Sequence, residues 1–266
     1  RHIIPELESL KGVLQPPEHH WDVFEHSLHT VDELEWVAEF ATVEHGLLAG
    51  QPDGPLLAAR LNAYLSETLP GGRTRLTLVK LAALLHDVAK PVTKSIGADG
   101  RIHFYGHQEQ GAVMAGEILR RLRFASREVA AVGTMIRAHL RLAQFMESEP
   151  TGRAVYRYFR DTGAEGVATL LLSLADHRAA RGPALIPAEW QGHVALTRRM
   201  IAAAYQAPSA QVSPPRLITG QDVMAALSIT AGPRVGRALE EIREAQAAGQ
   251  VTTREEAIAL ARQVAP

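Results

Sequence analysis

The stretch Leu78–Pro91, LVKLAALLHDVAKP, is the most apolar helical segment of the chain and ends in a group of polar residues. Its leucine, valine and alanine residues recur at three- and four-residue spacing, which predicts a helix from about Thr74 to Lys90. Because proline disfavours helix in the residue before it, this helix should stop near Pro91. Such an apolar helix is predicted to lie at the centre of the protein.

The same periodicity extends over most of the chain, and alternating strand-like runs are scarce. We therefore predict an all-α protein. A short hairpin or irregular loop is expected around residues 93–106, because ADG forms a turn signal between β-compatible runs. Asp22 and Ser126 are the predicted caps of two helices. The predicted helices of the main body cover residues 22–45, 56–69, 74–90, 107–122, 126–142, 151–160, 164–178 and 187–205.

A change of composition divides the chain near its C-terminal fifth. Residues 207–216, APSAQVSPPR, concentrate proline and serine and predict a linker or long loop. We therefore predict a domain over residues 1–206 and a small helical tail over residues 217–266. In the tail, Thr219 and Thr253 each precede an acidic residue by three positions, which predicts two helices with capping boxes. Between them, Val235, Leu239 and Ile242 fall on one helical face.

Composition excludes several classes of protein. The 266 residues are 46% hydrophobic and 21% charged, as in folded globular proteins, and no apolar run is long enough to span a membrane. The N-terminus lacks the pattern of a secretory signal, so a cytoplasmic location is the default expectation. Cysteine is absent, which leaves histidine and carboxylate as the strong metal ligands. The net charge of −1 gives no general attraction to nucleic acid.

The chemistry indicated by the central helix is metal binding. His86 and Asp87 lie near its end, and a buried imidazole beside a buried carboxylate loses hydration unless both are paired or bound to an ion. One such pair cannot complete a site. Further candidates occur in other predicted helices with core-facing stripes, as expected for an ion held inside a helical bundle. These candidates are His26, His107, His139 and Asp176.

Each of these residues also has an ordinary structural interpretation. A single helical histidine such as His26 is more often hydrogen-bonded than metal-bound, and Asp176 can pair with Arg178. Lys90 can be a solvated lysine that complements the helix dipole. Only the combination of these residues in one sequence is a specific indication of a metal site. His29, His103 and His177 are candidates for groups around the ligands, whereas the other histidines are assigned to structural or surface roles: His2, His19, His20, His45 and His193.

The order His26, His86-Asp87, Asp176 resembles the His…His-Asp…Asp signature of HD-domain metal-dependent phosphohydrolases. A longer set of motifs resembles the HD domain and C-terminal tail of bacterial tRNA nucleotidyltransferases and related poly(A) polymerases. These motifs are VFEHSLHTV (23–31), ALLHDVAKP (83–91), DGRIHFYGHQEQGA (99–112), RLRF (121–124), MIRAHLR (135–141), LITGQDVMAAL (217–227) and GPRVGRALEEIREAQAAGQVTTREEA (232–257).

The resemblance implies a helical HD bundle with a small tail and a site for one or two divalent ions. It implies that His26, His86, Asp87 and Asp176 bind one ion and that Asp87 bridges to a second ion held by His107 and His139. It also implies that Lys90 faces a phosphate. Nitrogen and oxygen ligands suit Mg, Mn, Fe, Co, Ni or Zn, and the sequence does not choose among them.

The proposed ligands and Lys90 favour metal-dependent hydrolysis of a phosphoester. The resemblance implies the substrates, which are phosphomonoesters or cyclic phosphodiesters in nucleotides or RNA ends. Arg137 and Arg141, near His139, are further candidates for phosphate binding. No segment of residues 1–85 resembles the polymerase head of the nucleotidyltransferases, with its glycine-rich strand and paired aspartates. The sequence is therefore expected to be either an excised or naturally shortened C-terminal portion of such a protein or a relative that lacks the head, and polymerase activity is not expected of this chain.

The alternative is a helical body that holds tRNA or another RNA without catalysis of its own. Three groups of arginines favour it, since such stripes contact phosphates without reading bases. The same arginines are also compatible with an ordinary solvated surface, and aromatic residues, at 5%, offer few stacking platforms for single-stranded RNA. The groups are Arg120, Arg121, Arg123 and Arg127; Arg153, Arg157 and Arg160; and Arg234 and Arg237.

Overall fold

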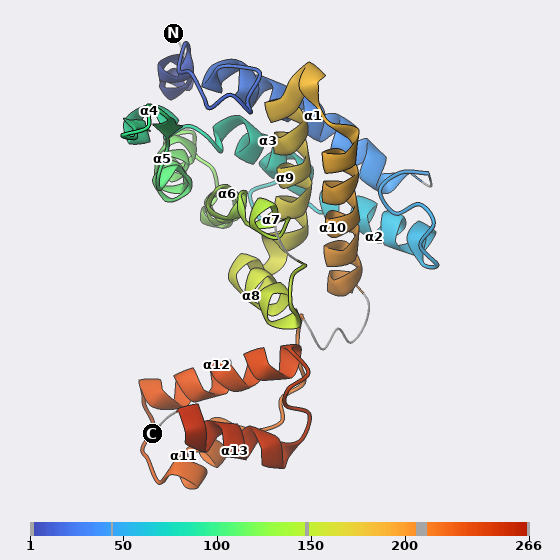
Figure 1. Cartoon of the computed structure of the whole chain (residues 1–266), viewed down its shortest axis with the longest axis vertical. Helices are drawn as coiled ribbons and strands as arrows, with labels where there is room; N and C mark the ends of the chain where they lie inside the picture. Colours follow the sequence, from blue (N-terminus) through green and yellow to red (C-terminus); the bar gives the residue numbers. More distant parts are fainter. Residues whose placement is uncertain (1–2, 44, 147–148, 206–211, 265–266) are drawn as a thin grey trace. The chain divides into compact units, whose positions relative to one another are not determined.

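The computed structural model describes residues 3–43, 45–146, 149–205 and 212–264 and is almost entirely helical (Figure 1). The chain folds into two compact units, one formed by residues 1–147 and 164–200 and the other by residues 148–163 and 201–266. The elements of the first unit, in chain order, are η1 (Pro5–Leu10), α1 (Val23–Thr42), α2 (Gly54–Ser66), α3 (Arg75–Leu85), α4 (Lys90–Thr93), β1 (Ser95–Ile96), β2 (Ile102–His103), α5 (His107–Arg121), α6 (Ser126–Ala138), α7 (Arg141–Gln144), most of η2 (Gly163–Glu165), α9 (Gly166–Arg181), η3 (Gly182–Ala184) and most of α10 (Pro187–Tyr205).

Helices α3 and α9 form the centre of the first unit. Helix α3 packs against α1, α2, α6 and α9, and α9 in turn packs along α1 (Figure 1). Residues 166–175 of α9 are buried without interruption, which explains the largely apolar run VATLLLSLA. The expectation of a central apolar helix before His86 is therefore confirmed, and α9 shares that position with it.

Two predicted helices are interrupted at histidines that the sequence singled out. The helix predicted over residues 74–90 ends at Leu85, and the one predicted over 126–142 ends at Ala138, so His86 and His139 each follow a helix end. Pro91 does not stop a helix as predicted. It lies in the first turn of α4, where its missing N–H group costs no helical hydrogen bond.

The segment between α4 and α5 forms the predicted small hairpin. Strands β1 and β2 pair antiparallel, with Ser95 opposite His103 and Ile96 opposite Ile102. Gly106 then has a φ angle of 74° directly before α5. Because this left-handed conformation suits glycine, the chain reverses here and begins α5 at His107.

Helix caps follow the predicted chemistry at one site and differ at another. Asp22 caps α1 by accepting a hydrogen bond from the backbone N–H of Glu25 at 2.9 Å. Ser126, in contrast, is the first residue of α6 and not its cap. Ala125 holds the cap position, and its N–H donates to the buried carboxylate of Glu128 at 2.9 Å. The start of α6 is thus stabilised by the carboxylate of Glu128, three residues after the cap, and not by the hydroxyl group of Ser126.

The second unit contains α8 (Gly152–Thr162), α11 (Gly220–Leu227), α12 (Pro233–Ala247) and α13 (Arg254–Val264). Val235 and Ile242 are buried in its core, and Leu239 packs against that core, as their shared helical face predicted. The threonines at 219 and 253 each accept a hydrogen bond from the N–H group three residues later, which confirms both predicted helix starts.

Helix α8 is the element that the predicted domain division did not assign to the tail. It packs against α12 through ion pairs of its three arginines with Glu240, Glu241 and Glu244. The boundary between residues 206 and 217 stays a prediction. Residues 207–211 of the predicted linker, like His2, lie outside the described residues. None of the helices in the described ranges has the length and apolarity needed to cross a membrane.

Candidate metal centre

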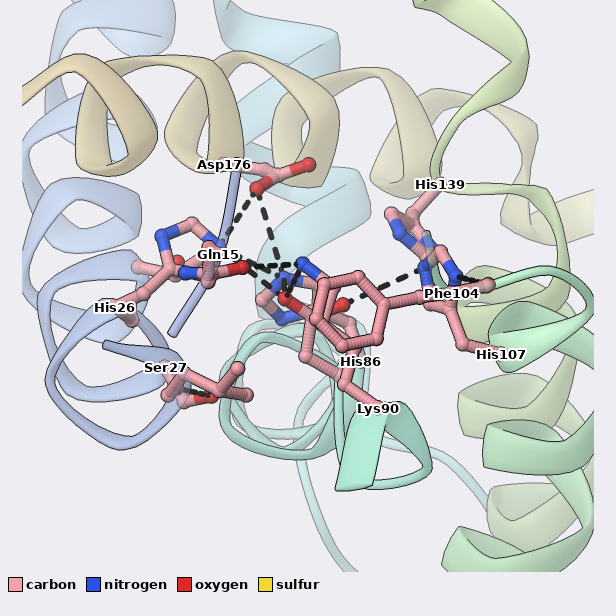
Figure 2. A network of polar contacts seen from close by, with 12 residues as sticks. Gln15, His26, Ser27, His86, Lys90, Phe104, His107, His139 and Asp176 are labelled. Atoms are coloured by element: carbon pink, nitrogen blue, oxygen red, sulfur yellow. Dashed lines mark hydrogen bonds and ion pairs between the residues drawn. The ribbon is translucent and has the colours of Figure 1, made fainter. Parts of the chain in front are cut away.

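Six side chains from five helical segments point toward one buried region of the first unit, most of them seen in Figure 2. His26 extends from the first turn of α1, and Asp176 from the second half of α9. His86 and Asp87 follow α3, His107 begins α5, and His139 follows α6. The helix packing thus brings together every candidate ligand that the sequence analysis named.

Four of these residues converge closely. The Nε2 atom of His26 lies 3.1 Å from Nε2 of His86 and 3.0 Å from Oδ1 of Asp176. The Nε2 atom of His86 lies 3.1 Å from Oδ2 of Asp87 and 3.5 Å from Oδ1 of Asp176. The donor atoms of these four residues therefore lie close together, and their binding to one shared ion stays a prediction.

Asp87 also faces a second set of donors. Its Oδ1 atom lies 3.5 Å from Nε2 of His107, and His139 offers a donor within 4.8 Å of both residues. A further group with the same 4.8 Å limit contains His86, His139 and Asp176. Asp87 thus lies between two sets of ligand atoms, one on each of its carboxylate oxygens.

Hydrogen bonds fix the orientation of three imidazole rings. In His86, His107 and His139, Nδ1 lies 2.8, 2.7 and 2.6 Å from the backbone carbonyl oxygen three residues earlier. A carbonyl only accepts, so Nδ1 is the protonated nitrogen and, in the neutral ring, Nε2 carries the free lone pair. This arrangement prepares Nε2 as a metal ligand.

The donor set fits a divalent ion. Asp87 Oδ1 and His107 Nε2 are buried and form no hydrogen bond within the described part of the chain. Buried polar atoms without partners are costly, and a cation bound between them removes that cost. Imidazole nitrogen and carboxylate oxygen suit Mn, Fe, Co, Ni and Zn, and the carboxylates also suit Mg.

Electrostatics divide the histidines into two kinds. Burial alone would lower the pKa of His86, but the negative charges of Asp87 and Asp176 outweigh it and raise this pKa to about 10. Burial, followed by the charge of His86, lowers the pKa of His139 to about 4. The pKa of Asp87 is held well below its ordinary value despite burial, because His86 and Lys90 favour its anionic form.

Lys90 is buried at the same centre and not solvated. Its Nζ atom lies 2.6 Å from Asp87 Oδ2 and donates a hydrogen bond to Oε1 of Gln15 at 2.6 Å (Figure 2). Gln15 was not identified from the sequence, because it lies in a segment without periodicity before α1. Arg178 pairs with Glu33, so Asp176 is not the partner of this arginine.

Two cavities open onto the centre. One, of about 260 Å³, is lined by Asp87, Lys90, His107 and the hairpin residues His103, Phe104 and Tyr105. The other, of about 160 Å³, is lined by His177, His193 and Arg181. His19, His139 and Asp176 line both cavities.

For two histidines near the centre, the structure differs from the role that the sequence analysis assigned. His19 and His193 were assigned to structural or surface roles, yet His19 lies beside His26, with 5.5 Å between ring centroids, and His193 stacks on His177 at 3.9 Å. His177 and His103 line the cavities, as expected for neighbours of the ligands. His29 instead stacks on Trp21 at 4.1 Å. No helical pattern marks His19, because it precedes α1.

Neither Arg137 nor Arg141 lines the two cavities of the centre. Arg137 lies two residues before His139, which places it on a different face of the helical turn. Its Nε atom donates to Oε2 of Glu109 at 2.7 Å. The structure therefore brings Lys90 to the centre and leaves the two arginines outside it.

Comparison with known proteins gives two family matches. Residues 23–181 match the model of the HD domain, and residues 107–261 match the model described as tRNA nucleotidyltransferase domain 2, putative. The chain is 34% identical over 256 residues to an A-adding tRNA nucleotidyltransferase of Deinococcus radiodurans, covering 96% of this chain and 49% of the relative. It is 34% identical over 257 residues to a CC-adding tRNA nucleotidyltransferase of Thermus thermophilus, covering 96% and 48%. The chain thus spans about half the length of these relatives.

Proposed function

The chain belongs to the HD-domain family, with the second domain of tRNA nucleotidyltransferases in its C-terminal part, and from this we propose that it is a metal-dependent phosphohydrolase. The proposed ligands are His26, His86, Asp87 and Asp176 for one ion, and Asp87, His107 and His139 for a second. The observation that carries the proposal is that two buried ligand atoms of this set, Asp87 Oδ1 and His107 Nε2, have no hydrogen-bond partner within the described residues.

A divalent ion held by these residues would supply hydroxide from water near neutral pH and offset charge on phosphoryl oxygens. The side chains of the protein supply the rest. Lys90 presents a fixed positive charge at the cavity, where it attracts a phosphate oxygen as a point charge. The hydrogen bond to Gln15 and the contact with Asp87 hold its ammonium group in place. No covalent intermediate with the protein is required.

The proposed substrates carry a nucleobase beside the phosphate. The rings of His103 and Tyr105 both line the 260 Å³ cavity and are stacked, with 5.0 Å between their centroids and 10° between their planes, and Tyr105 is 76% exposed. An exposed ring next to a phosphate site is a stacking surface for a base. We therefore favour nucleotides or RNA ends, with a phosphomonoester or a cyclic phosphodiester as the reacting group. The relatives are named for action on tRNA, which agrees with an RNA end.

The reaction is tested by removing bound metal, adding back each of the six candidate ions, and assaying AMP and a 2′,3′-cyclic nucleotide. We expect hydrolysis with at least one ion and none with chelator. Lys90→Met should lower kcat/KM by about tenfold to a hundredfold, because it removes the positive charge from the phosphate site. Lys90 also contacts Asp87, so metal analysis of the variant separates this loss from a loss of bound metal. The exposed Lys94 provides the matched control, Lys94→Met, which should have no effect. Absence of hydrolysis with every ion would overturn the proposal.

The contribution of the aromatic pair is tested with substrates that differ in the base alone. Tyr105→Ala should raise KM for AMP several-fold, because stacking stabilises the bound base. The same variant should leave KM for ribose 5-phosphate unchanged. Ile96→Ala, on the same hairpin and similarly exposed, is the control. An equal change for both substrates would show that Tyr105 does not recognise the base.

The second candidate function is an RNA-holding body without hydrolysis. It is favoured by the match of residues 107–261 to a tRNA nucleotidyltransferase domain and by Arg123 and Arg127, neither of which has an ion pair within the described residues. Binding of tRNA together with the absence of metal-dependent hydrolysis would select this function over the first.

A further inference from the structure

A third cavity lies in the groove between α5 and α6 and shares no lining residue with the two cavities of the metal centre. Its volume of about 490 Å³ is within the range of small-molecule sites. Ala112, Gly116 and Arg120 face it from α5 at intervals of four residues. Successive residues of an α-helix are rotated by about 100° around its axis, so the side chain of His107 points roughly 140° away from that of Ala112. The groove is therefore separate from the metal centre.

The floor of the groove is built from very small residues. Gly116 and Gly133 lie within α5 and α6, where glycine disfavours helix. Tight packing does not require Gly133, since an added Cβ atom would meet only the carbonyl oxygen of Ala112, at 4.0 Å. At Gly116 the nearest group would be the end of the Arg120 side chain, at 3.3 Å. These glycines keep the groove open.

The walls of the groove are positively charged. The guanidinium of Arg120 folds back over Gly116, and no carboxylate pairs with Arg120 among the residues that the structure describes. Arg137 lines the opposite side, with Nε bound to Glu109 and its two terminal nitrogens available. Of the neighbouring arginines, Arg121 pairs with Glu6, whereas Arg123 and Arg127 have no ion pair among the described residues. Guanidinium groups in this arrangement favour a phosphate.

A ring and two hydroxyl groups complete the lining. Phe124 lines the groove, and the guanidinium of Arg73 lies 3.8 Å from the centroid of its ring. Ser126 and Thr134 also line the groove and are donors or acceptors for a sugar or a base. The combination of paired guanidinium groups, an aromatic ring and hydroxyls matches the three parts of a nucleotide.

We propose that the α5–α6 groove is a nucleotide-binding site, in which Arg120 and Arg137 bind the phosphate and Phe124 contacts the base. The nucleotide is either free or one residue of an RNA strand, and the two sources share this chemistry. The site is distinct from the proposed hydrolytic centre, so it does not depend on hydrolysis. Arg137, which the sequence analysis assigned to phosphate binding beside His139, binds phosphate here instead.

The test is calorimetric titration of the full chain, in chelator, with AMP, adenosine, inorganic phosphate and a short oligoribonucleotide. Arg120→Gln should weaken binding of AMP at least about tenfold, the usual loss for a charged hydrogen bond. Gly133→Leu should do the same by filling the groove, and its melting temperature reports whether the fold is kept. Arg127→Gln removes the same charge from a neighbouring residue outside the groove and should change the affinity less than about twofold.

Binding of AMP that both Arg120→Gln and Gly133→Leu abolish, while Arg127→Gln retains it, supports a site for a free nucleotide. Binding of the oligoribonucleotide alone, with the same response to the three variants, supports a site for an RNA strand. Equal losses in Arg127→Gln and Arg120→Gln would show diffuse attraction to surface charge and overturn the proposal. Full affinity in a folded Gly133→Leu variant would also overturn it. Metal-dependent hydrolysis should stay unchanged in Arg120→Gln.

Discussion

At the scale of single residues, His86 and His139 occupy equivalent positions in the fold. Each follows directly on the end of a helix, with φ and ψ near −59° and −32°, and each directs Nδ1 to the carbonyl group three residues earlier. The last carbonyl groups of a helix have no N–H partner within that helix. One of these carbonyl groups therefore accepts the hydrogen bond from Nδ1 of the histidine. The break in the helix at each of these histidines is what orients its imidazole ring.

The two extra histidines lead to a prediction about metal number. If His107 and His139 hold a second ion, the metal-saturated protein contains about two equivalents, and His107→Ala or His139→Ala lowers this toward one and reduces hydrolysis. Metal analysis of the purified variants measures the change. A single equivalent in the saturated wild-type protein, retained with full activity in both variants, would contradict a two-ion site.

Asp87 provides the comparison within this experiment. It lies between the two sets of donors, so Asp87→Ala should remove more metal than His107→Ala. The ordering follows because the carboxylate is placed to contact every ion present, whereas His107 contacts one. Equal metal content in the two variants would count against the bridging position of Asp87.

At the scale of elements, the position of α6 depends on one buried carboxylate. Glu128 Oε2 accepts hydrogen bonds from the N–H of Ala125 and from Arg73, each at 2.9 Å. The loop before α3 comes close to the same group, since a Cβ atom at Gly71 would lie about 2 Å from the Glu128 carboxylate. Glu128 therefore joins the start of α6 to the loop that precedes α3.

We predict that Glu128→Ala lowers the free energy of unfolding by about 2 kcal/mol, because Arg73 and the N–H of Ala125 lose a charged acceptor. Urea denaturation followed by circular dichroism measures the effect. Glu117→Ala, at an exposed position of α5, is the control and should change stability by less than about 0.5 kcal/mol. Similar urea midpoints for the two variants would show that Glu128 does not hold the start of α6 to the loop before α3.

The helical tail has a stability that should depend on pH. The hydrogen bonds from Thr219 and the contact with Arg254 lower the pKa of Asp222 to about 2. An unfolded aspartate titrates near 3.9, so the stabilising contribution is complete above about pH 4 and is lost as the pH falls through about 2. Asp222→Asn should therefore destabilise the protein at pH 7, and its difference from wild type should narrow at pH 3.

Thermal unfolding of both proteins at the two pH values measures this difference. Glu255→Gln changes an exposed acid in the same tail and serves as the control. A constant difference between wild type and Asp222→Asn at pH 7 and pH 3 would show that the charge of Asp222 is not the source of the effect.

At the scale of the whole molecule, positive and negative charges almost balance, with 28 basic and 29 acidic residues. The arginine stripe of α8 does not add a free basic surface, since all three of its arginines pair with acids of α12. The pairs join two helices within the second unit, and they lower the positive charge that RNA would meet there. A local basic segment is left at residues 120–127, where Arg121 pairs with Glu6 but Arg120, Arg123 and Arg127 have no ion pair among the described residues.

We predict from this balance that the chain binds tRNA weakly and that the affinity falls steeply with salt. The protein is expected to contact few phosphates of the RNA. Each contact releases a counterion, and the free energy gained from that release falls as the salt concentration rises. Titrations with tRNA at roughly 50 and 200 mM salt measure the slope. Tight binding that salt leaves unchanged would show that stacking or shape recognition, and not charge, dominates.

The sequence by itself determined the helical class, most helix positions and the types of side chain available as metal ligands. Periodicity located the main helices, because burial of one helix face leaves a regular pattern in the sequence. The Thr-x-x-acid spacing located two tail helices, because capping is a local interaction over three residues. The absence of cysteine and the His-Asp pair at 86–87 restricted the site to imidazole and carboxylate ligands.

Only the tertiary structure decided which polar groups meet. It brought Gln15 and His19 to the centre from a segment without periodicity, and it directed Arg137 into a different groove from His139. It also placed the acids of α12 against the arginines of α8. These contacts join residues far apart in the chain, and their geometry depends on how helices pack, which local sequence patterns do not specify.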